Sequence, residues 1–77
     1  IGDLEVYDEV NNTDYVELLI NYFENNCKVN ETASSLYIHR NTVNYKINKI
    51  EEILDLNLSD IGDRSKVYLS LMIRYLI

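Results

Sequence analysis

The sequence predicts an all-α fold, a small bundle of four to five helices built around a helix-turn-helix. Three observations predict it. The 77 residues contain no proline and only two glycines, so the residues that mark the turns of an all-β protein are missing. Hydrophobic residues make up 47% of the chain and recur at helical spacing. Residues 30–50 have the pattern of two helices that meet through a turn of three or four residues.

The first third of the chain predicts one amphipathic helix and a segment before it. Residues 1–10 mix apolar and acidic side chains, which fits either a short helix or an arm lying on the domain. Asp14, with Glu17 three residues later, has the form of a capping box, so a helix is expected to begin there. Asn25-Asn26 is expected to end it, because asparagine tolerates the left-handed conformation of a C-cap. The apolar residues of this helix form one stripe: Tyr15, Leu18, Leu19, Tyr22 and Phe23.

Three further helices are expected in the rest of the chain. Asn30 can cap a short second helix, a break follows around residues 37–39, and a third helix is expected over 40–54. Asp60 or Asp63 can cap the last helix. That helix is apolar on more than half of its circumference, so we expect it to be buried against several helices or a second subunit. The residues expected to face inward are Ala33, Leu36, Val43, Ile47, Ile50, Ile53 or Leu54, Val67, Leu71 and Tyr75.

The charges of the chain are unevenly distributed. The formal net charge is −6, yet residues 26–50 carry four basic side chains and one acidic one. Residues 1–25 carry seven acidic side chains and no basic one. A concentrated basic stretch indicates a surface for an anionic partner, with chance clustering on a solvated face as the alternative. The acidic residues are expected to form a solvated face turned away from that partner.

Composition also bears on the cell compartment and on the size of the intact protein. Cys27 is the only cysteine, which excludes an internal disulfide and a Cys-rich zinc site and favours a reducing cytoplasm. The longest uncharged apolar run, residues 67–73, is far shorter than the ~20 residues of a membrane span. A cytoplasmic protein is therefore expected. The only methionine is Met72, so residues 1–77 are expected to be a single domain, the C-terminal part of a longer chain.

The informative stretch is residues 30–50, within the expected helix-turn-helix core of residues 30–54. Two helices that cross closely need a small residue at the crossing, and Ala33 supplies it. Leu36 and Ile38 are apolar on either side of the turn and can anchor the corner. Val43 and Ile47 then point inward from the second helix of the pair. All five requirements of the motif are met at the right spacing.

The second helix of such a motif places its N-terminal residues in the major groove of DNA. Arg40 can pair bidentately with guanine, and Asn41 or Asn44 with adenine. Lysines suit phosphate contacts, as do the backbone N–H groups at the start of a helix. The residues in these places are His39, Arg40, Asn41, Thr42, Asn44 and Tyr45 for the base edges, with Lys28, Lys46 and Lys49 for phosphates.

Residues 36–47, LYIHRNTVNYKI, closely resemble the C-terminal helix-turn-helix of the PucR/CdaR family, regulators of purine-catabolism and sugar-diacid genes. The core is also similar to Fis-type DNA-binding domains. The resemblance implies sequence-specific binding of double-stranded DNA, as the output domain of a bacterial transcriptional regulator. It also implies a small-molecule effector sensed by an N-terminal region. Because a single module buries too little surface for tight and specific binding, a homodimer is expected in the full-length protein. The resemblance also places Asn30, His39, Arg40, Thr42, Asn44 and Tyr45 at DNA-facing positions.

Two positions depart from the common pattern. Tyr37 stands where many helix-turn-helix proteins have a glycine in a left-handed turn, which costs ~1–2 kcal/mol if that geometry is kept. PucR-like sequences nevertheless commonly have a bulky residue there. Lys46 stands where the family more often has arginine, so any bidentate contact is lost.

Other interpretations accompany these. His39 has no close partner for a metal, so an N-cap role is favoured, and we expect no metal or cofactor. Thr42 can cap its own helix or contact a phosphate, and Tyr45 can cover the flank of the domain or contact DNA. An enzyme is not expected, because the acidic residues come without a clustered histidine or a Gly-rich loop. The main alternative function is a helical protein–protein interaction or dimerisation module that uses the last helix.

Overall fold

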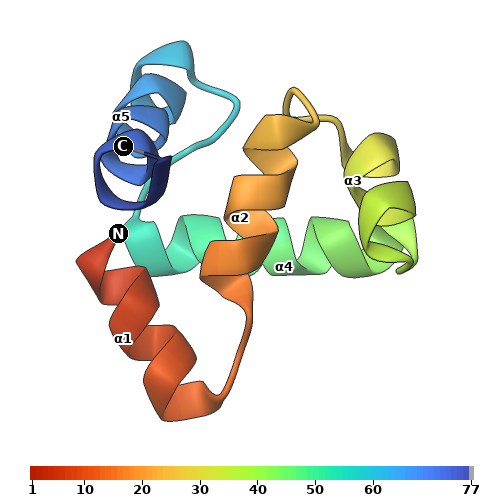
Figure 1. Ribbon diagram of the computed structural model, residues 1–77, viewed down its shortest axis with the longest axis horizontal. Helices are drawn as coiled ribbons and strands as arrows, with labels where there is room; N and C mark the ends of the chain where they lie inside the picture. The colour runs from red at the N-terminus through yellow and green to blue at the C-terminus, as the bar shows by residue number, and fades with distance from the viewer. Residues whose placement is uncertain (77) are drawn as a thin grey trace.

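The computed structural model describes residues 1–76 and confirms the all-α fold (Figure 1). The helices are α1 (Gly2–Asn11), α2 (Tyr15–Glu24), α3 (Val29–Leu36), α4 (Arg40–Leu54) and α5 (Ile61–Leu71), followed by a π-helical turn, η1 (Met72–Leu76). The segment before α2 is therefore a helix and not an arm. Within residues 1–76, no helix has the length and apolar content needed to cross a bilayer.

The longest helix, α4, is the one around which the others are arranged. Figure 1 shows α2 crossing it, α3 standing at its N-terminal end and α5 lying near its C-terminal end. Helix α1 packs against both α2 and α4. The result has dimensions of 28 × 27 × 23 Å. In the first turns of α4, residues 40–42, 44 and 45 are exposed to solvent.

The core follows the predicted helical stripes. Val43, Ile47 and Ile50 are buried along the inner face of α4, as their spacing predicted, with Ile53 and Leu54 half-buried. Thr32 is the buried polar residue of α3, and its hydroxyl donates to the backbone carbonyl of Lys28 at 2.8 Å. The remaining buried apolar residues are Leu4, Tyr15, Leu18, Leu19, Tyr22, Ala33, Leu58, Val67 and Leu71.

The expected capping box at the start of α2 is wrong. Asp14 occupies the N-cap position, but its side chain makes no capping hydrogen bond. The carboxylate of Asp8, in α1, accepts instead from the backbone N–H groups of Tyr15 and Val16, each at 2.9 Å, and from the hydroxyl of Thr13. The chain turns back sharply after α1, and this brings Asp8 over the first free N–H groups of α2. The cap therefore comes from a neighbouring helix.

The start of α3 also differs from the prediction. The N-cap is Lys28, without a side-chain cap, and Asn30 lies exposed within the first turn. The reason lies in the preceding connection, where Asn26 (φ 59°) and Cys27 (φ 61°) are both left-handed and reverse the chain early. The predicted end of α2 is confirmed, since the helix stops at Glu24 and an asparagine adopts the left-handed conformation.

The C-terminal helix is capped as predicted but is less buried than expected. The carboxylate of Asp60 accepts from the backbone N–H of Asp63 at 3.0 Å. Val67 and Leu71 are buried, whereas Leu69 and Ile73 are 58% and 74% exposed. Tyr75, expected on the inner face, is exposed, because the π turn η1 changes the helical period after Leu71.

The π turn is held to the first helix by Glu5. Its carboxylate accepts from the guanidinium of Arg74 at 2.9 and 3.1 Å and from the hydroxyl of Tyr75. This hydrogen bond to Glu5, with a smaller contribution from burial, raises the pKa of Tyr75 above its ordinary value. The two ends of the described chain are thus joined at the surface.

We expect Asp8→Ala to lower the free energy of unfolding by about 2 kcal/mol, because two helix N–H groups and a hydroxyl lose their acceptor. Asp14→Ala, which removes the carboxylate from the N-cap position itself, should cost less than about 1 kcal/mol. Urea denaturation followed by far-UV circular dichroism measures both. If Asp14→Ala lowered the free energy of unfolding more than Asp8→Ala does, the cap of α2 would have to be assigned to Asp14.

Candidate nucleic-acid interface

The corner between α3 and α4 is formed by hydrogen bonds at the end of α3. Tyr37 adopts the left-handed conformation (φ 59°, ψ 40°), and the N–H of Ile38 donates to the carbonyl of Ala33 at 3.0 Å. The N–H of Tyr37 donates to the carbonyl of Ser34 at 3.3 Å. This pair of bonds is a Schellman motif, which ends the helix and fixes the direction of the chain that leaves it. The predicted break at residues 37–39 is confirmed.

The side chain of Tyr37 does not offset the cost of the left-handed backbone conformation at this corner. Tyr37 is 94% exposed, so its ring buries almost no surface to compensate for the unfavourable backbone conformation. A non-glycine residue in this conformation costs ~1–2 kcal/mol. The turn is therefore kept by the contacts around it, which include the buried Ala33 and the half-buried Ile38.

His39 begins α4 as its N-cap. Its Nδ1 atom accepts from the backbone N–H of Asn41 at 3.0 Å. A nitrogen that accepts a hydrogen bond carries no proton, so the neutral imidazole has its proton on Nε2. Within residues 1–76 there is no group of three His, Cys, Asp or Glu side chains placed to hold a metal ion. His39 thus fixes the start of α4, as the sequence favoured.

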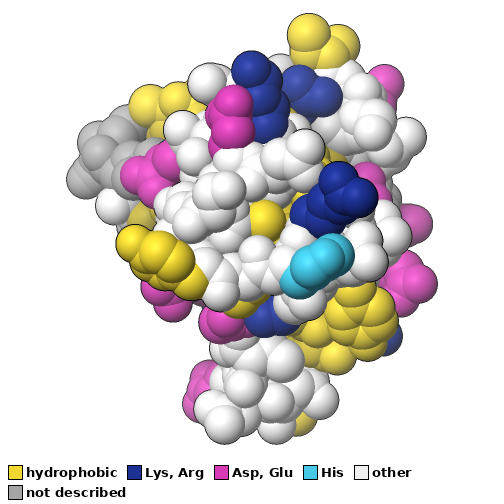
Figure 2. Space-filling model, turned by 90° about the vertical axis from the view of Figure 1, so that its right-hand side faces the viewer, with side chains coloured by type: hydrophobic (Ala, Val, Ile, Leu, Met, Phe, Trp, Pro, Cys, Tyr) yellow, Lys and Arg dark blue, Asp and Glu magenta, His cyan; other side chains and the backbone are white. Residues whose placement is uncertain are grey.

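The exposed face of α4 begins directly after this cap. The buried residues Val43, Ile47 and Ile50 occupy the opposite side of the helix. Figure 2 looks onto this end of the molecule, where the chain's single histidine (cyan) and basic side chains (dark blue) lie among white uncharged groups, with acidic side chains (magenta) beside some of the basic ones. The exposed residues from the cap onward are His39, Arg40, Asn41, Thr42, Asn44, Tyr45 and Asn48.

A shallow hollow between the start of α3 and the start of α4 brings several of the predicted residues together. It is lined at the start of α3 by Lys28, Val29, Asn30 and Glu31, and from α4 by Arg40 and Asn44. Asn30, Arg40 and His39 also line an adjacent hollow beside the corner. Residues from both helices therefore share one polar surface, although Asn30 does not have the capping role predicted for it.

The lysines predicted to meet phosphates each have an acidic neighbour. The Nζ atom of Lys28 lies 3.8 Å from Oε1 of Glu31, and the Nζ atom of Lys49 lies 3.6 Å from Oε2 of Glu52. Both pairs are spaced i,i+3 in the sequence. Lys46 pairs with a more distant residue, Asp14, described below. In contrast, Arg40 takes part in none of the ion pairs formed within residues 1–76. Among the described residues its guanidinium has no carboxylate within 4 Å, although Glu31 lines the same hollow.

The pairing of Lys46 with Asp14 was not predicted. The Nζ atom of Lys46 donates to Oδ1 of Asp14 at 3.1 Å, across 32 positions of sequence. The Lys28 and Lys49 pairs have a local signal, the i,i+3 spacing, that sequence reasoning can use. No local pattern indicates the Lys46 pair, because it depends on how α2 crosses α4.

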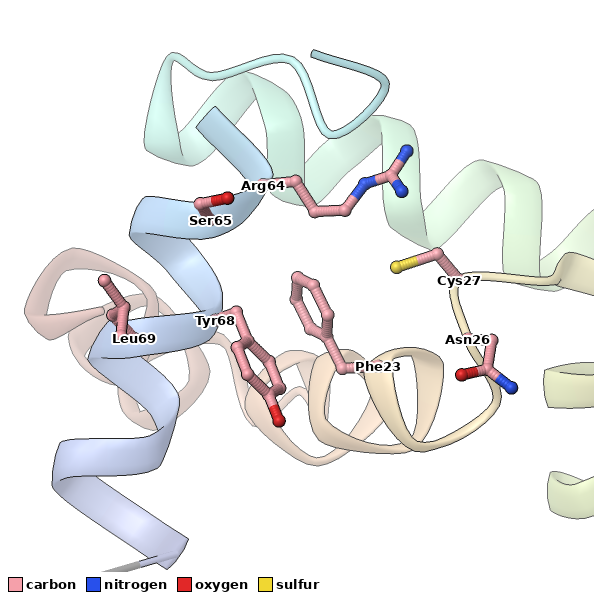
Figure 3. A pocket seen from close by; sticks show the side chains of 7 residues that line it. All are labelled: Phe23, Asn26, Cys27, Arg64, Ser65, Tyr68 and Leu69. Atoms are coloured by element: carbon pink, nitrogen blue, oxygen red, sulfur yellow. The ribbon is translucent and has the colours of Figure 1, made fainter. Parts of the chain in front are cut away.

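A separate groove lies between α2 and α5 and includes no residue of α4 (Figure 3). The ring centroids of Phe23 and Tyr68, which both line the groove, lie 5.5 Å apart. The Nε atom of Arg64 donates to the backbone carbonyl of Leu58 at 2.9 Å. Burial raises the pKa of the Cys27 thiol, although Arg64 opposes the shift, so the thiol stays protonated at neutral pH. The lining residues, Phe23, Asn26, Cys27, Arg64, Ser65, Tyr68 and Leu69, include no histidine or carboxylate to activate it.

A polar helix start, fixed at a tight corner by a left-handed turn and an N-cap, defines the helix-turn-helix class of transcription-regulator domain. The chain belongs to the family described as the PucR C-terminal helix-turn-helix domain, whose model matches residues 15–73. The resemblance carried by residues 36–47 is thereby confirmed. This family is a class of regulator domain and not a class of enzyme. No solved structure matches the chain.

Three curated relatives from Bacillus subtilis (strain 168) illustrate the family. The chain is 41% identical to the proline-responsive transcriptional activator PutR over 91% of its own length and 17% of the relative's. It is 30% identical to the DNA-binding transcriptional activator AdeR, over 99% and 18% of the two lengths. Identity to the purine catabolism regulatory protein is 43%, over 73% and 10%. The chain therefore spans less than a fifth of each relative.

We expect Tyr37→Gly to raise the free energy of unfolding by about 0.5–1 kcal/mol, because glycine removes the left-handed strain but adds freedom to the unfolded chain. In a domain of this size that shifts the melting temperature by about 2–8 °C. Tyr37→Ala is the matched control, since it removes the same exposed ring but keeps the strain. Equal melting temperatures for the glycine and alanine variants would contradict the expected gain, and a glycine variant that melts below the alanine variant would show that the turn is unstrained.

Proposed function

We propose that this domain binds double-stranded DNA sequence-specifically, as the output domain of a bacterial transcriptional regulator, with the first turns of α4 in the major groove. The observation that carries the proposal is the exposed polar row that begins directly after the His39 cap. A major groove about 12 Å wide admits one α-helix, and base edges there are read by the side chains at its N-terminal end. Membership of a regulator-domain family supports this function.

Base reading is assigned to three residues of α4. Arg40 is exposed and free of the ion pairs described above, so its guanidinium is available for the two acceptors of a guanine. Asn41 and Asn44 are exposed on the same helix and suit adenine. Tyr45, 65% exposed, lies one residue further and is placed for a sugar or a thymine methyl, with Thr42 for a phosphate. His39 holds the helix start in register.

Phosphate contacts are assigned to the edges of this face. Lys28 and Asn30 lie at the start of α3, on the far side of the hollow from Arg40. The free N–H groups in the first turn of α3 add partial positive charge at the same place. Lys46 and Lys49 follow further along α4. These contacts position the domain on any duplex, and the base contacts select the sequence.

The working unit proposed is a homodimer in the cytoplasm. A single module of this size buries too little surface for tight and specific binding, and two copies read half-sites about 34 Å apart. The exposed Leu69 and Ile73 provide apolar surface of the kind that a second copy can cover. PutR is named as proline-responsive, and by analogy a small-molecule effector of the regulator would be sensed by an N-terminal region outside this domain.

We expect Arg40→Ala to weaken binding to a duplex selected from a random pool by roughly 5- to 150-fold, which corresponds to the loss of one bidentate base contact. Binding to a mixed-sequence duplex should fall only a few-fold. Fluorescence anisotropy at ~50 and ~200 mM salt measures both, and each phosphate contact contributes ~0.9 to the salt slope. Lys66→Ala, which removes an exposed cation of α5, is the control and should stay near the parent. Salt-insensitive binding, or none even with the domain dimerised through a fused coiled coil, would contradict the proposal.

A protein–protein interaction module is the second candidate, favoured by the exposed Leu69 and Ile73. We expect the Leu69→Glu/Ile73→Glu variant to fold, because both residues are at the surface, and to lose self-association in sedimentation equilibrium. Val10→Glu, at a 77% exposed position of α1, is the control for added charge. If Leu69→Glu/Ile73→Glu abolished the function of the regulator while Arg40→Ala left that function unchanged, a protein–protein interaction module would replace DNA binding as the proposed function.

A further inference from the structure

Asp14 occupies a helix N-cap position without acting as a cap. Asp8 supplies the hydrogen bonds that an N-cap carboxylate would give to the first turn of α2. The Asp14 carboxylate is turned instead toward α4, where it accepts from the ammonium of Lys46 at 3.1 Å. An acidic residue that could serve its own helix is thus committed to the candidate DNA-binding helix.

We propose that Asp14 competes with DNA phosphate for Lys46 and thereby lowers the affinity of this domain for any duplex. The inference rests on the proposed function, since it concerns a lysine that is assigned there to a phosphate contact. In the free domain Lys46 lies on Asp14. In the complex a phosphate oxygen takes the place of the carboxylate, and Asp14 is left close to a second anion.

The geometry makes this exchange more costly than the corresponding exchange at the other two lysines. The Lys46 side chain is only 25% exposed and that of Asp14 is 59% exposed, so on the lysine side this pair is less screened by water than the other two. The Lys28 and Lys49 pairs are longer, at 3.8 and 3.6 Å, and their lysines are more exposed. Those two lysines can turn toward a phosphate with little loss, because exposed i,i+3 pairs contribute only a few tenths of a kcal/mol.

Competition from Asp14 is expected to lower the affinity for all DNA sequences equally. Phosphate contacts supply nearly all of non-specific binding and carry no sequence information. A carboxylate that weakens one of them lowers the affinity for every duplex by the same factor. The base contacts of Arg40 and its neighbours then make up a larger share of the total binding energy.

The test is a double-mutant cycle on binding to a mixed-sequence duplex, measured by fluorescence anisotropy. Asp14→Asn should tighten binding by roughly 2- to 5-fold, the range expected for one partly exposed ion pair. In a Lys46→Ala background the same substitution should have clearly less effect, because only the repulsion between Asp14 and DNA remains to be removed. Asp14→Ser, which also keeps a good N-cap residue, should reproduce Asp14→Asn.

Glu17→Gln is the matched control, since it removes one exposed negative charge from the first turn of the same helix. An equal gain in Glu17→Gln, or an equal effect of Asp14→Asn in both Lys46 backgrounds, would overturn the inference and leave the proposed function standing. Loss of helical circular dichroism in both Asp14 variants would also overturn it, because Asp14 would then have a structural role. Absence of salt-dependent binding in the parent domain would instead contradict the proposed function itself.

Discussion

The left-handed turn at Tyr37 is the constraint on which the candidate site depends. It ends α3, and its two hydrogen bonds to the carbonyls of Ala33 and Ser34 set the direction in which the chain leaves. His39 then starts α4 two residues later by capping the N–H of Asn41. Because only Ile38 separates the left-handed residue from the N-cap, the first turns of α4 leave α3 at a fixed angle. The polar face of α4 is therefore oriented by backbone geometry, and its side chains need not take part in holding the corner.

Charge on this face is more balanced than the basic stretch of the sequence suggests. Each of the three lysines has a carboxylate within 4 Å, and Arg40 belongs to none of the ion pairs of the described chain. The acidic residues of the first third are also not simply a solvated face. Asp8 caps a neighbouring helix, Glu5 binds the C-terminal π turn, and Asp14 contacts α4. An acidic domain can in this way present one short cationic edge and keep the rest of its surface repulsive to DNA.

Helical periodicity made most of the fold predictable. The inner face of α4, the ends of α2 and α4 and the break before His39 all follow from patterns within a few residues, and the structure has them as expected. The exposure of most candidate residues was predictable for the same reason, although Lys46 and Lys49 are half-buried. The cap from Asp8, the pairing of Lys46 with Asp14 and the outward position of Tyr75 were not. Each depends on how two helices are placed in space, and no spacing in the sequence encodes that placement.

The cap supplied by Asp8 also has a consequence for the dynamics of the domain. The matched family region begins at Tyr15, yet the first N–H groups of α2 are satisfied by a side chain of α1, which precedes that region. If α1 detaches, those amides are exposed to solvent exchange even while the rest of α2 remains helical. Hydrogen-exchange protection at Tyr15 and Val16 therefore reports on the docking of α1.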